Sequence, residues 1–422
     1  MNILADVPKG AALPRVQLLA DAFPVVSQTF VVELAAALRT AGVPLHLLAT
    51  GSDGADPSLL HGHPAGEDLA RRMVEPAGGV GQIARFLARQ TLQGRPPLRL
   101  MARAVRHPHH ARNLLGRAAA FAQAEPVDVL HCQFATLGMM ALRYRDMGIL
   151  RFSRLVVHLR GWDVSQYTAQ HGPDALARVF AEGDMFVANC RFFADRAIEL
   201  GCHPDRVVVI GSPIDTNRFA PPATPRQPSG TLRVGAVGRL VEKKGFGDLI
   251  DGVAALRDRG VAATLDIIGE GPLRPDLEAQ IQRHDLGDSV TLRGAAPSDA
   301  VLEMLHSVDL FVAPSVRAKS GDEDAPVNTL KEALATGLPV IGTRHGGIPE
   351  LVEDGTNGFL VPERDPQALA QAMAKIAGTS AARRSEMGAV GREKVIAEYS
   401  RPVIAARTID AYYKAIHKET RQ

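Results

Sequence analysis

The chain has few cysteines and lacks the features of secreted and membrane-spanning proteins. Its 422 residues include three cysteines, far apart and without a Cys-x-x-Cys pair. This argues against a disulfide framework or a zinc site and suits a reducing cytoplasm. The N-terminus lacks the basic start and apolar run of a signal peptide, and no run approaches the ~20 apolar residues of a membrane span. We expect a cytoplasmic protein, soluble or peripheral at the inner face of the cell membrane.

The chain also lacks a strong excess of charge of either sign. A formal net charge of +2 with 22% charged and 46% hydrophobic residues is ordinary for a soluble globular protein and gives no argument for a nucleic-acid partner. A strand-anchored Gly-x-Gly-x-x-Gly fingerprint of dinucleotide-binding folds is missing too. This absence disfavours a dehydrogenase.

What the chain does have is an alternation of strand-like apolar runs and helical stretches. Residues 16–20 and 44–48 flank a predicted helix at about 27–39, a β-α-β opening typical of a parallel sheet. Further strand-like runs lie at residues 127–131, 155–159, 186–189 and 207–210. After a proline-rich linker at 221–230, others follow at 233–237, 263–268, 290–292, 310–313 and 340–342. We predict an α/β chain of two doubly wound domains.

Residues 76–124 combine arginines with apolar side chains and contain no Asp, Glu or Lys. The arginines are Arg85, Arg89, Arg95, Arg99, Arg103, Arg106, Arg112 and Arg117. This pattern predicts a basic amphipathic helical region of the kind that lies on anionic membranes or binds phosphorylated partners. The alternative is a solvated face packed on the sheet.

Two loops after predicted strands carry cations and glycines. In GRLVEKKGFGDLI (238–250), Gly238 permits a close turn and Arg239 and Lys244 lie five positions apart. Two cations at the carboxyl edge of a parallel sheet suit a diphosphate, although a solvated surface loop is the alternative. In GEGPLRPDLE (269–278), Gly269 and Gly271 turn the chain into a helix.

The stretch DEDAPVNTLKEALATG (322–337) places three carboxylates before a helix. Acidic residues suit a helix N-terminus, and Thr329 to Glu332 has the pattern of a capping box. Asp322 and Asp324 also spell Asp-x-Asp, a pattern whose carboxylate oxygens can hold a divalent metal. We favour no metal here, because Arg239 and Lys244 already supply positive charge.

In this order the motifs of residues 238–362 resemble those of the glycosyltransferases of family 4. VTLRG (290–294) and APVNTLKEALATGLPVIGTRHGGIPELVEDGTNGFLVP (325–362) complete that match. In the first half, FPVVSQTF (23–30), HCQFATLG (131–138), HLRGWDVS (158–165), NCRFFADRAIELG (189–201) and GSPIDTNRF (211–219) resemble the members that act in colanic-acid-type exopolysaccharide and cell-surface polysaccharide assembly.

The resemblance implies the GT-B architecture of two facing Rossmann-like domains. Residues 1–217 would form an acceptor-binding domain, completed by residues 400–422, whose helix crosses back to it. Residues 218–399 would form the domain that binds a nucleotide sugar.

In this family two carboxylates with seven residues between them hold the nucleotide sugar, and Glu332 matches the second. Counting back gives Asp324 as the first, whereas Glu323 keeps the usual spacing to Pro326, so either can be the first member. The catalytic residues implied are Arg239, Lys244, Asp324, Glu332 and Arg160. Those implied in donor binding are Gly238, Gly269, Gly271, Arg293, Glu323, Pro326 and the helix start at Asn328, Thr329 and Leu330, whose free N–H groups can meet phosphate oxygens.

The first half departs from the family at Arg160, where many relatives have histidine. Arginine can stabilise an anionic diphosphate but is a poor proton acceptor, because its pKa stays above ~12. His158 is a weak substitute, and His131 is either a cleft contact or a core histidine. Ser27 and Gln28 open a helix near the cleft, where N-capping is the simpler role. Asp163 is a further cleft candidate.

The resemblance implies a retaining glycosyltransferase that moves a sugar from a UDP- or GDP-sugar to a lipid-linked saccharide. We expect neither a metal nor another cofactor. Two alternatives stay open: a nucleotide-sugar epimerase of GT-B architecture, and a non-catalytic protein that only binds a nucleotide sugar.

Overall fold

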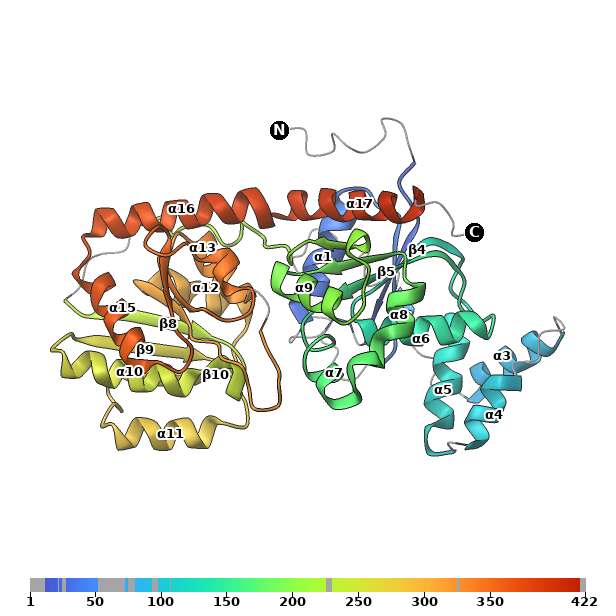
Figure 1. Ribbon diagram of the computed structural model, residues 1–422, viewed down its shortest axis with the longest axis horizontal. Helices are drawn as coiled ribbons and strands as arrows, with labels where there is room; N and C mark the ends of the chain where they lie inside the picture. The colour runs from blue at the N-terminus through green and yellow to red at the C-terminus, as the bar shows by residue number, and fades with distance from the viewer. Residues whose placement is uncertain are drawn as a thin grey trace.

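The computed structural model describes residues 12–21, 23–24, 28–51, 73–74, 80–92, 98–106, 108–224, 230–324 and 327–417. These residues form two α/β domains, each around its own parallel sheet, which lie side by side along the long axis of the molecule (Figure 1). The predicted α/β class with two doubly wound sheets is confirmed.

The first domain holds a seven-stranded sheet in the order β3-β2-β1-β4-β5-β6-β7, with all neighbouring strands parallel. Its strands are β1 (Val16–Ala20), β2 (Leu45–Ala49), β3 (Met73–Val74), β4 (Val127–Cys132), β5 (Phe152–Leu159), β6 (Met185–Ala188) and β7 (Val207–Val209). Six of them fall on the predicted runs. The short edge strand β3 was not predicted.

Helices cover both faces of this sheet. On one face, α1 (Thr29–Thr40) and α17 (Arg401–His417) pack over a core that includes Leu18, Val156 and Tyr412. A second core, with Phe121 and Leu142, lies on the opposite face. The other helices of this domain are α3 (Val80–Leu92), α4 (Leu98–Arg106), α5 (Pro108–Phe121), α6 (Ala135–Asp146), α7 (Gln166–His171), α8 (Ala177–Glu182) and α9 (Arg191–Glu199).

The second domain holds a six-stranded parallel sheet in the order β10-β9-β8-β11-β12-β13. Its strands are β8 (Leu232–Val237), β9 (Ala263–Ile268), β10 (Val290–Gly294), β11 (Leu310–Ala313), β12 (Val340–Thr343) and β13 (Gly358–Val361). Its helices are α10 (Phe246–Asp258), α11 (Arg274–Arg283), α12 (Ser298–Ser307), α13 (Asn328–Ala335), α14 (Ile348–Leu351), α15 (Pro366–Gly378) and α16 (Ala381–Tyr399). The edge strand β13 was not predicted.

The chain passes between the domains twice, and the two crossings touch. Ile214, beyond β7, forms an isolated bridge with Ser400 and donates its N–H to the Tyr399 carbonyl at 2.8 Å. Ser400 separates α16 from α17, and the two helices run along one long side of the molecule (Figure 1). The predicted return of the C-terminal helix to the first domain is confirmed, since α17 buries Tyr412 there.

The described parts of the arginine-rich segment are helical. Helices α3, α4 and α5 project at the end of the first domain that is remote from the second (Figure 1). Phe86 and Leu100 bury their side chains in the core of the first domain. The alternative of a face packed on the body of the domain therefore holds for part of the segment.

Another part of this segment is an exposed apolar surface. On α4, Leu98 is 67% exposed, Met101 45% and Val105 80%. These three side chains are spaced by three and four positions, so they share one face of the helix. In the described part of the chain, no helix is long and apolar enough to cross a membrane.

Candidate active site

The sheet order of the second domain brings the loops after β8 and β11 to one crevice. These strands are neighbours at the centre of the sheet, and the chain leads from them towards opposite edges. In open parallel sheets, ligands bind outside the carboxyl ends of the strands at such a switch point. The loop after β8 carries Arg239 and Lys244, and the loop after β11 carries Asp324.

Asp324 is the centre of a buried ionic cluster in this crevice. Its Oδ2 atom lies 2.7 Å from Lys244 Nζ and accepts a hydrogen bond from Ser315 Oγ at 2.9 Å. Its Oδ1 atom lies 3.3 Å from Lys243 Nζ, which is also 3.0 Å from Asp322 Oδ2. Burial alone would raise the pKa of Asp324, but Lys244 and Lys243 hold it well below its ordinary range. The carboxylate therefore stays ionised.

The structure distinguishes the two candidates for the first carboxylate by position. Asp324 contacts Lys244, whereas Glu323 lies 3.5 Å from Arg317 Nε on the neighbouring part of the loop. Of the two, Asp324 is therefore the one that lies against the cation expected to bind phosphate.

A buried histidine fixes the backbone at Asp324. The Asp324 N–H donates to His345 Nε2 at 3.0 Å, and His345 Nδ1 lies 2.7 Å from Glu363 Oε1. An accepting Nε2 places the proton on Nδ1, which donates to Glu363. Gly346 follows with φ +50°, and a Cβ atom there would overlap the carbonyl oxygen of Asp324. The loop therefore needs glycine at this position.

Glu332 lies inside α13 and is not used for capping. Helix α13 begins at Asn328 after the N-cap residue Val327, and no side chain caps it. Thr329 Oγ1 instead donates to the Val237 carbonyl at 3.4 Å. The capping-box alternative is therefore wrong. Burial, and then the Glu33 carboxylate on α1 of the first domain, raise the pKa of Glu332 to about 7.

The N–H groups at the start of α13 are not all free. The Leu330 N–H donates to the Val327 carbonyl at 3.0 Å, and the Leu330 side chain is fully buried. The expectation that the Leu330 N–H can meet a phosphate is therefore wrong. Asn328 and Thr329 remain in the first turn, and Pro326 lies outside the described residues.

Gly238, Gly269 and Gly271 belong to two turns that pack backbone to backbone. A Cβ atom on Gly269 would overlap the carbonyl oxygen of Gly238, and one on Gly271 would lie 2.5 Å from the carbonyl oxygen of Leu240. The turns are therefore built for close approach, and they fix the loop that carries Arg239.

Two arginines are exposed at this edge of the sheet. Arg293 Nη2 lies 2.8 Å from Asp266 Oδ2, and this hydrogen bond raises the pKa of Arg293. Arg239 is exposed, and no ion pair joins it to a carboxylate in the described part of the chain. Arg239 is therefore the cation of the pair whose charge is open to a ligand.

Arg160 follows β5 and is held in the first domain by polar side chains. Its Nη2 atom lies 2.5 Å from Gln133 Oε1 and 3.3 Å from His158 Nδ1, and Nη1 donates to Ser212 Oγ at 3.1 Å. Its guanidinium carbon lies 4.1 Å from the centre of the Phe30 ring. Burial lowers the pKa of Arg160 to about 9, so the side chain is still charged at neutral pH.

Asp163 supports the loop that carries Arg160. Its Oδ1 atom accepts from the Arg160 N–H at 3.0 Å and the Gly161 N–H at 3.1 Å, and Oδ2 accepts from the Ala135 N–H at 2.9 Å. The residue is fully buried, and burial raises its pKa. These contacts make Asp163 a structural residue beneath the cleft rather than one of its walls.

His131 and His158 lie in the core on the α17 side of the first sheet. Their rings stack with centres 5.6 Å apart, and His131 Nδ1 lies 2.8 Å from Tyr412 Oη. Burial lowers the pKa of His131 to about 3 and that of His158 well below its ordinary value, so both are neutral. For His131 the structure favours the core alternative. Gln28 is the N-cap residue of α1 but forms no side-chain cap, and Ser27 lies outside the described residues.

Two further residues connect the domains next to the crevice. Lys331 on α13 is 1% exposed and donates to the Ser212 carbonyl at 2.9 Å, with its ammonium 4.9 Å from the centre of the Tyr399 ring. Glu350 on α14 accepts from the N–H groups of Arg191 and Phe192 at 2.9 and 3.2 Å. A carboxylate of the second domain thus caps α9 of the first.

Sequence reasoning missed Lys243, His345 and Lys331. Lys243 stands beside Lys244 but has the pattern of a solvated loop residue. His345 directly precedes two glycines of the matched motif, which is a signal that could have found it. Lys331 has none, because a lysine within a helix normally lies in solvent.

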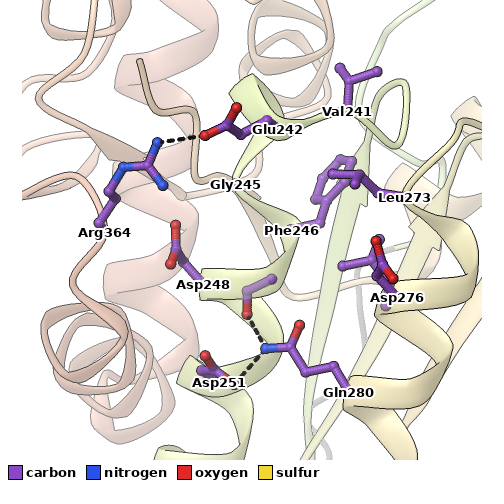
Figure 2. A pocket seen from close by; sticks show the side chains of 12 residues that line it. Val241, Glu242, Gly245, Phe246, Asp248, Asp251, Leu273, Asp276, Gln280 and Arg364 are labelled. Carbon is purple, nitrogen blue, oxygen red and sulfur yellow. Dashed lines mark hydrogen bonds and ion pairs between the residues drawn. The ribbon is translucent and has the colours of Figure 1, made fainter. Parts of the chain in front are cut away.

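A cavity of about 300 Å³ lies beside the crevice, between the loop after β8 and α11 (Figure 2). Val241, Phe246 and Leu273 give it apolar walls, while Asp248 and Asp276 are among its acidic residues. None of the predicted donor-binding residues lines it. The predicted catalytic residues likewise lie outside this cavity.

The Asp-x-Asp carboxylates face lysines. Asp322 pairs with Lys243, and Asp324 pairs with both Lys243 and Lys244. Within the described ranges, no group of three or more His, Cys, Asp or Glu side chains could hold a metal ion.

The chain matches known sequence families over both domains. Residues 231–378 match a family described as Glycosyl transferases group 1, and residues 27–218 match Glycosyltransferase Family 4. The putative colanic acid biosynthesis glycosyltransferase WcaL of Escherichia coli (strain K12) is 32% identical over 391 residues, which cover 90% of this chain and 95% of that protein. The amylovoran biosynthesis glycosyltransferase AmsK of Erwinia amylovora is 32% identical over 277 residues, 64% of this chain and 67% of that protein.

Solved structures share the fold. The Anabaena protein HepE, in its complex with UDP-glucose, superimposes with a TM-score of 0.68 at 16% identity, covering 95% of this chain and 100% of that chain. Sucrose-phosphate synthase from Thermosynechococcus elongatus gives a TM-score of 0.68 at 19% identity, covering 94% of this chain and 98% of that chain. The two matched sequence families, the identity to WcaL and the shared two-domain fold lead to one conclusion: the chain belongs to the family 4 glycosyltransferases and has their GT-B fold.

Proposed function

We propose that this protein is a retaining glycosyltransferase that moves a hexosyl group from a UDP- or GDP-sugar to a lipid-linked saccharide in bacterial exopolysaccharide or cell-surface polysaccharide synthesis. The observation that carries the proposal is the contact of Lys244 with the buried carboxylate of Asp324, made by the loops that follow the two central strands of the second sheet. The names of WcaL and AmsK, which refer to colanic acid and amylovoran biosynthesis, support the polysaccharide. The UDP-glucose complex of HepE supports a nucleotide-sugar donor.

The charges of the crevice fit the departure of a nucleoside diphosphate. When the bond between the anomeric carbon and the diphosphate breaks, negative charge grows on the leaving phosphate. Lys244 and the exposed Arg239 can stabilise that charge, which is the usual largest contribution to such catalysis. The carboxylate of Glu332 can accept hydrogen bonds from sugar or ribose hydroxyls. Retention of configuration rests on family resemblance.

The lysine pairs support a reaction without a metal. Both carboxylates of the Asp-x-Asp stretch are neutralised by Lys243 and Lys244, so a divalent cation would have to displace two ammonium groups. We therefore propose that EDTA leaves donor binding and turnover unchanged.

The first test is a thermal-shift series with UDP-, GDP- and dTDP-sugars and NAD, each with and without EDTA. A donor at 100 times its Kd stabilises the folded protein by roughly 2.7 kcal/mol. We expect one nucleoside-diphosphate sugar to raise the Tm regardless of EDTA. A response to NAD alone would contradict the proposal. Product analysis then separates transfer, which releases nucleoside diphosphate, from epimerisation, which leaves an altered sugar on its nucleotide.

The exposed face of α4 supports a lipid-linked acceptor and contact with an anionic membrane. Leu98, Met101 and Val105 are exposed, and so are the side chains of Arg106 on the same helix and of Arg85 and Arg89 on α3. Apolar side chains among cations are the pattern of helices that lie in the interface of anionic bilayers. Helix α4 also lies at the end of the first domain that is remote from the second domain (Figure 1).

Vesicle flotation tests this surface. We expect the wild type to float with vesicles of phosphatidylglycerol and phosphatidylcholine and not with phosphatidylcholine alone. The triple variant L98S/M101S/V105S should stay in solution. V390S/I396S is the matched control, because these α16 side chains are 38% and 40% exposed and lie outside the segment. Equal flotation of all three proteins would refute the assignment.

A further inference from the structure

Two buried cations, one from each domain, meet at Ser212. Arg160 of the first domain donates to Ser212 Oγ at 3.1 Å, and Lys331 of the second donates to the Ser212 carbonyl at 2.9 Å. Their exposed fractions are 9% and 1%. Both are therefore buried where the two domains meet, and Lys331 directly precedes Glu332.

Neither cation has a carboxylate within ion-pair distance among the residues that the structure describes. The acidic side chains nearby do not form ion pairs with these cations. The oxygens of Asp163 accept hydrogen bonds from three backbone N–H groups, and Glu332 forms no ion pair with Lys331. Charged side chains are normally buried only with a counter-charge, because desolvation is expensive. Two unpaired cations at one point therefore indicate that an anion belongs there.

Arg160 and two residues that contact it carry further polar atoms without partners. Arg160 Nε, Gln133 Nε2 and His158 Nε2 are buried and have no hydrogen-bond partner among the residues that the structure describes. Gln133 and His158 also contact the Arg160 guanidinium directly, at 2.5 and 3.3 Å. Buried donors are rarely left unsatisfied in native proteins. A bound oxyanion would accept from the guanidinium, the amide and the ammonium together.

Arg160 also makes Lys331 harder to bury in its charged form. Burial and then Arg160 lower the pKa of Lys331, to about 7, against the opposing effect of Glu332. An anion at this point would reverse the change and restore the charge of Lys331.

We propose that Arg160, Gln133 and Lys331 form a subsite for an oxyanion borne by a sugar substrate, namely the carboxylate of a uronic acid. The inference rests on the proposed sugar transfer, since the subsite joins the two domains through Ser212. The other source of an oxyanion is the donor diphosphate, but Lys244 and Arg239 already lie at the crevice assigned to it. With a carboxylated sugar bound, its carboxylate would pair with Arg160 and Lys331, and the donor diphosphate would pair with Lys244 and Arg239.

The test is saturation-transfer NMR with titration, using the full chain saturated with whichever of UDP and GDP raises its Tm. Sodium glucuronate and galacturonate are the probes, with glucose and galactose at matched ionic strength as neutral counterparts. We expect a uronate to bind at least about tenfold more tightly than its neutral counterpart. In R160Q and in K331M this preference should vanish, and in K331M nucleoside-diphosphate affinity should stay within about twofold. R160K, which keeps the charge, should retain part of the preference.

Matched variants separate the subsite from general effects. K375M removes an exposed lysine over the Phe359 ring, and R145Q removes a guanidinium near the Phe152 ring. Both should keep the uronate preference. K331M should fold with an unchanged or higher Tm, because it removes a buried charge without a counter-charge.

Two results would overturn the subsite. One is equal binding of uronates and neutral sugars by the wild type. The other is a loss of nucleoside-diphosphate affinity in R160Q and K331M without any uronate preference, which would assign the cations to the donor phosphates. The uronate titration is also run without nucleotide. A wild type that binds uronate but no nucleoside diphosphate would contradict the proposed function and leave the subsite standing.

Discussion

Lys331 and Glu332 are neighbours on α13, and burial moves their pKa values towards each other. The pKa of Lys331 falls from its ordinary 10.5 to about 7, while that of Glu332 rises from 4.5 to about 7. Each side chain therefore loses part of its charge near neutral pH in the unliganded protein. A substrate that supplies hydroxyl donors to Glu332 and an anion to Lys331 would favour the charged form of both.

The shifted lysine predicts how stability depends on pH. Between pH 7 and 10.5 the unfolded chain keeps a proton on Lys331 that the folded chain loses, so the free energy of unfolding rises with pH in that window. From pH 7 to 9, we expect the wild type to gain roughly 2 kcal/mol relative to K331M, since each pH unit is worth up to about 1.4 kcal/mol. Urea midpoints of both proteins at the two pH values measure this. A constant difference would show that Lys331 titrates normally.

Replacing Glu332 should separate catalysis from stability. Because this carboxylate caps nothing, E332Q should change the free energy of unfolding by less than about 1 kcal/mol. Loss of its hydrogen bonds to the donor should lower kcat/KM about 100-fold. The measurements are the release of nucleoside diphosphate and the Tm. A variant that turns over normally but melts earlier would return Glu332 to a structural role.

At the scale of single residues, the sequence predicts residue types better than contacts. The carboxylate pair that ends at Glu332 and the cation Lys244 could each be found from the spacing within its own motif. The choice between Asp324 and Glu323 could not, because it depends on a contact with Lys244, 80 positions away. The burial of Lys331 depends on Ser212 in the other domain, 119 positions away.

At the scale of elements, the turns after β8 and β9 are locked together by their backbones. A Cβ atom on Gly271 would lie 2.5 Å from the Leu240 carbonyl oxygen. We expect G271A to destabilise the protein by about 1–3 kcal/mol through overpacking and to weaken donor binding, because the turn carrying Arg239 must shift. G378A is the control, since a Cβ atom there meets nothing within 4 Å. Chemical denaturation and donor titration of both variants provide the test; equal stability of the two would contradict this packing.

Elements with strong periodicity could be predicted, and short edge elements could not. Six strands of the first sheet and five of the second fall on apolar runs in the sequence. β13 (Gly358–Val361) consists of four residues beginning with glycine, and it becomes a strand only by pairing with β12. The start of α13 at Asn328 likewise depends on the tertiary placement of Thr329 rather than on its capping propensity.

At the scale of the molecule, the domains are held in contact by few polar groups. Glu350 bonds the start of α9 across the cleft, at 2.9 and 3.2 Å. In E350Q we expect kcat/KM to fall about tenfold with little change in Tm, because the arrangement in which α14 contacts the start of α9 would be less populated. Small-angle X-ray scattering should show a larger radius of gyration.

E353Q is the control for this prediction, since Glu353 pairs with Lys394 within the second domain at 2.7 Å. If E353Q and E350Q lower kcat/KM alike, the contact of Glu350 with α9 has no special part in holding the two domains together.

The way the chain returns to its first domain has a consequence for its synthesis. One core of that domain contains Tyr412, Ile404 and Ile409 of α17, which the ribosome adds after the whole of the second domain. The first sheet, although made first, has one face covered only in part, by α1, until α17 arrives. The second domain therefore completes its core earlier, and the domain translated first is the last to be finished.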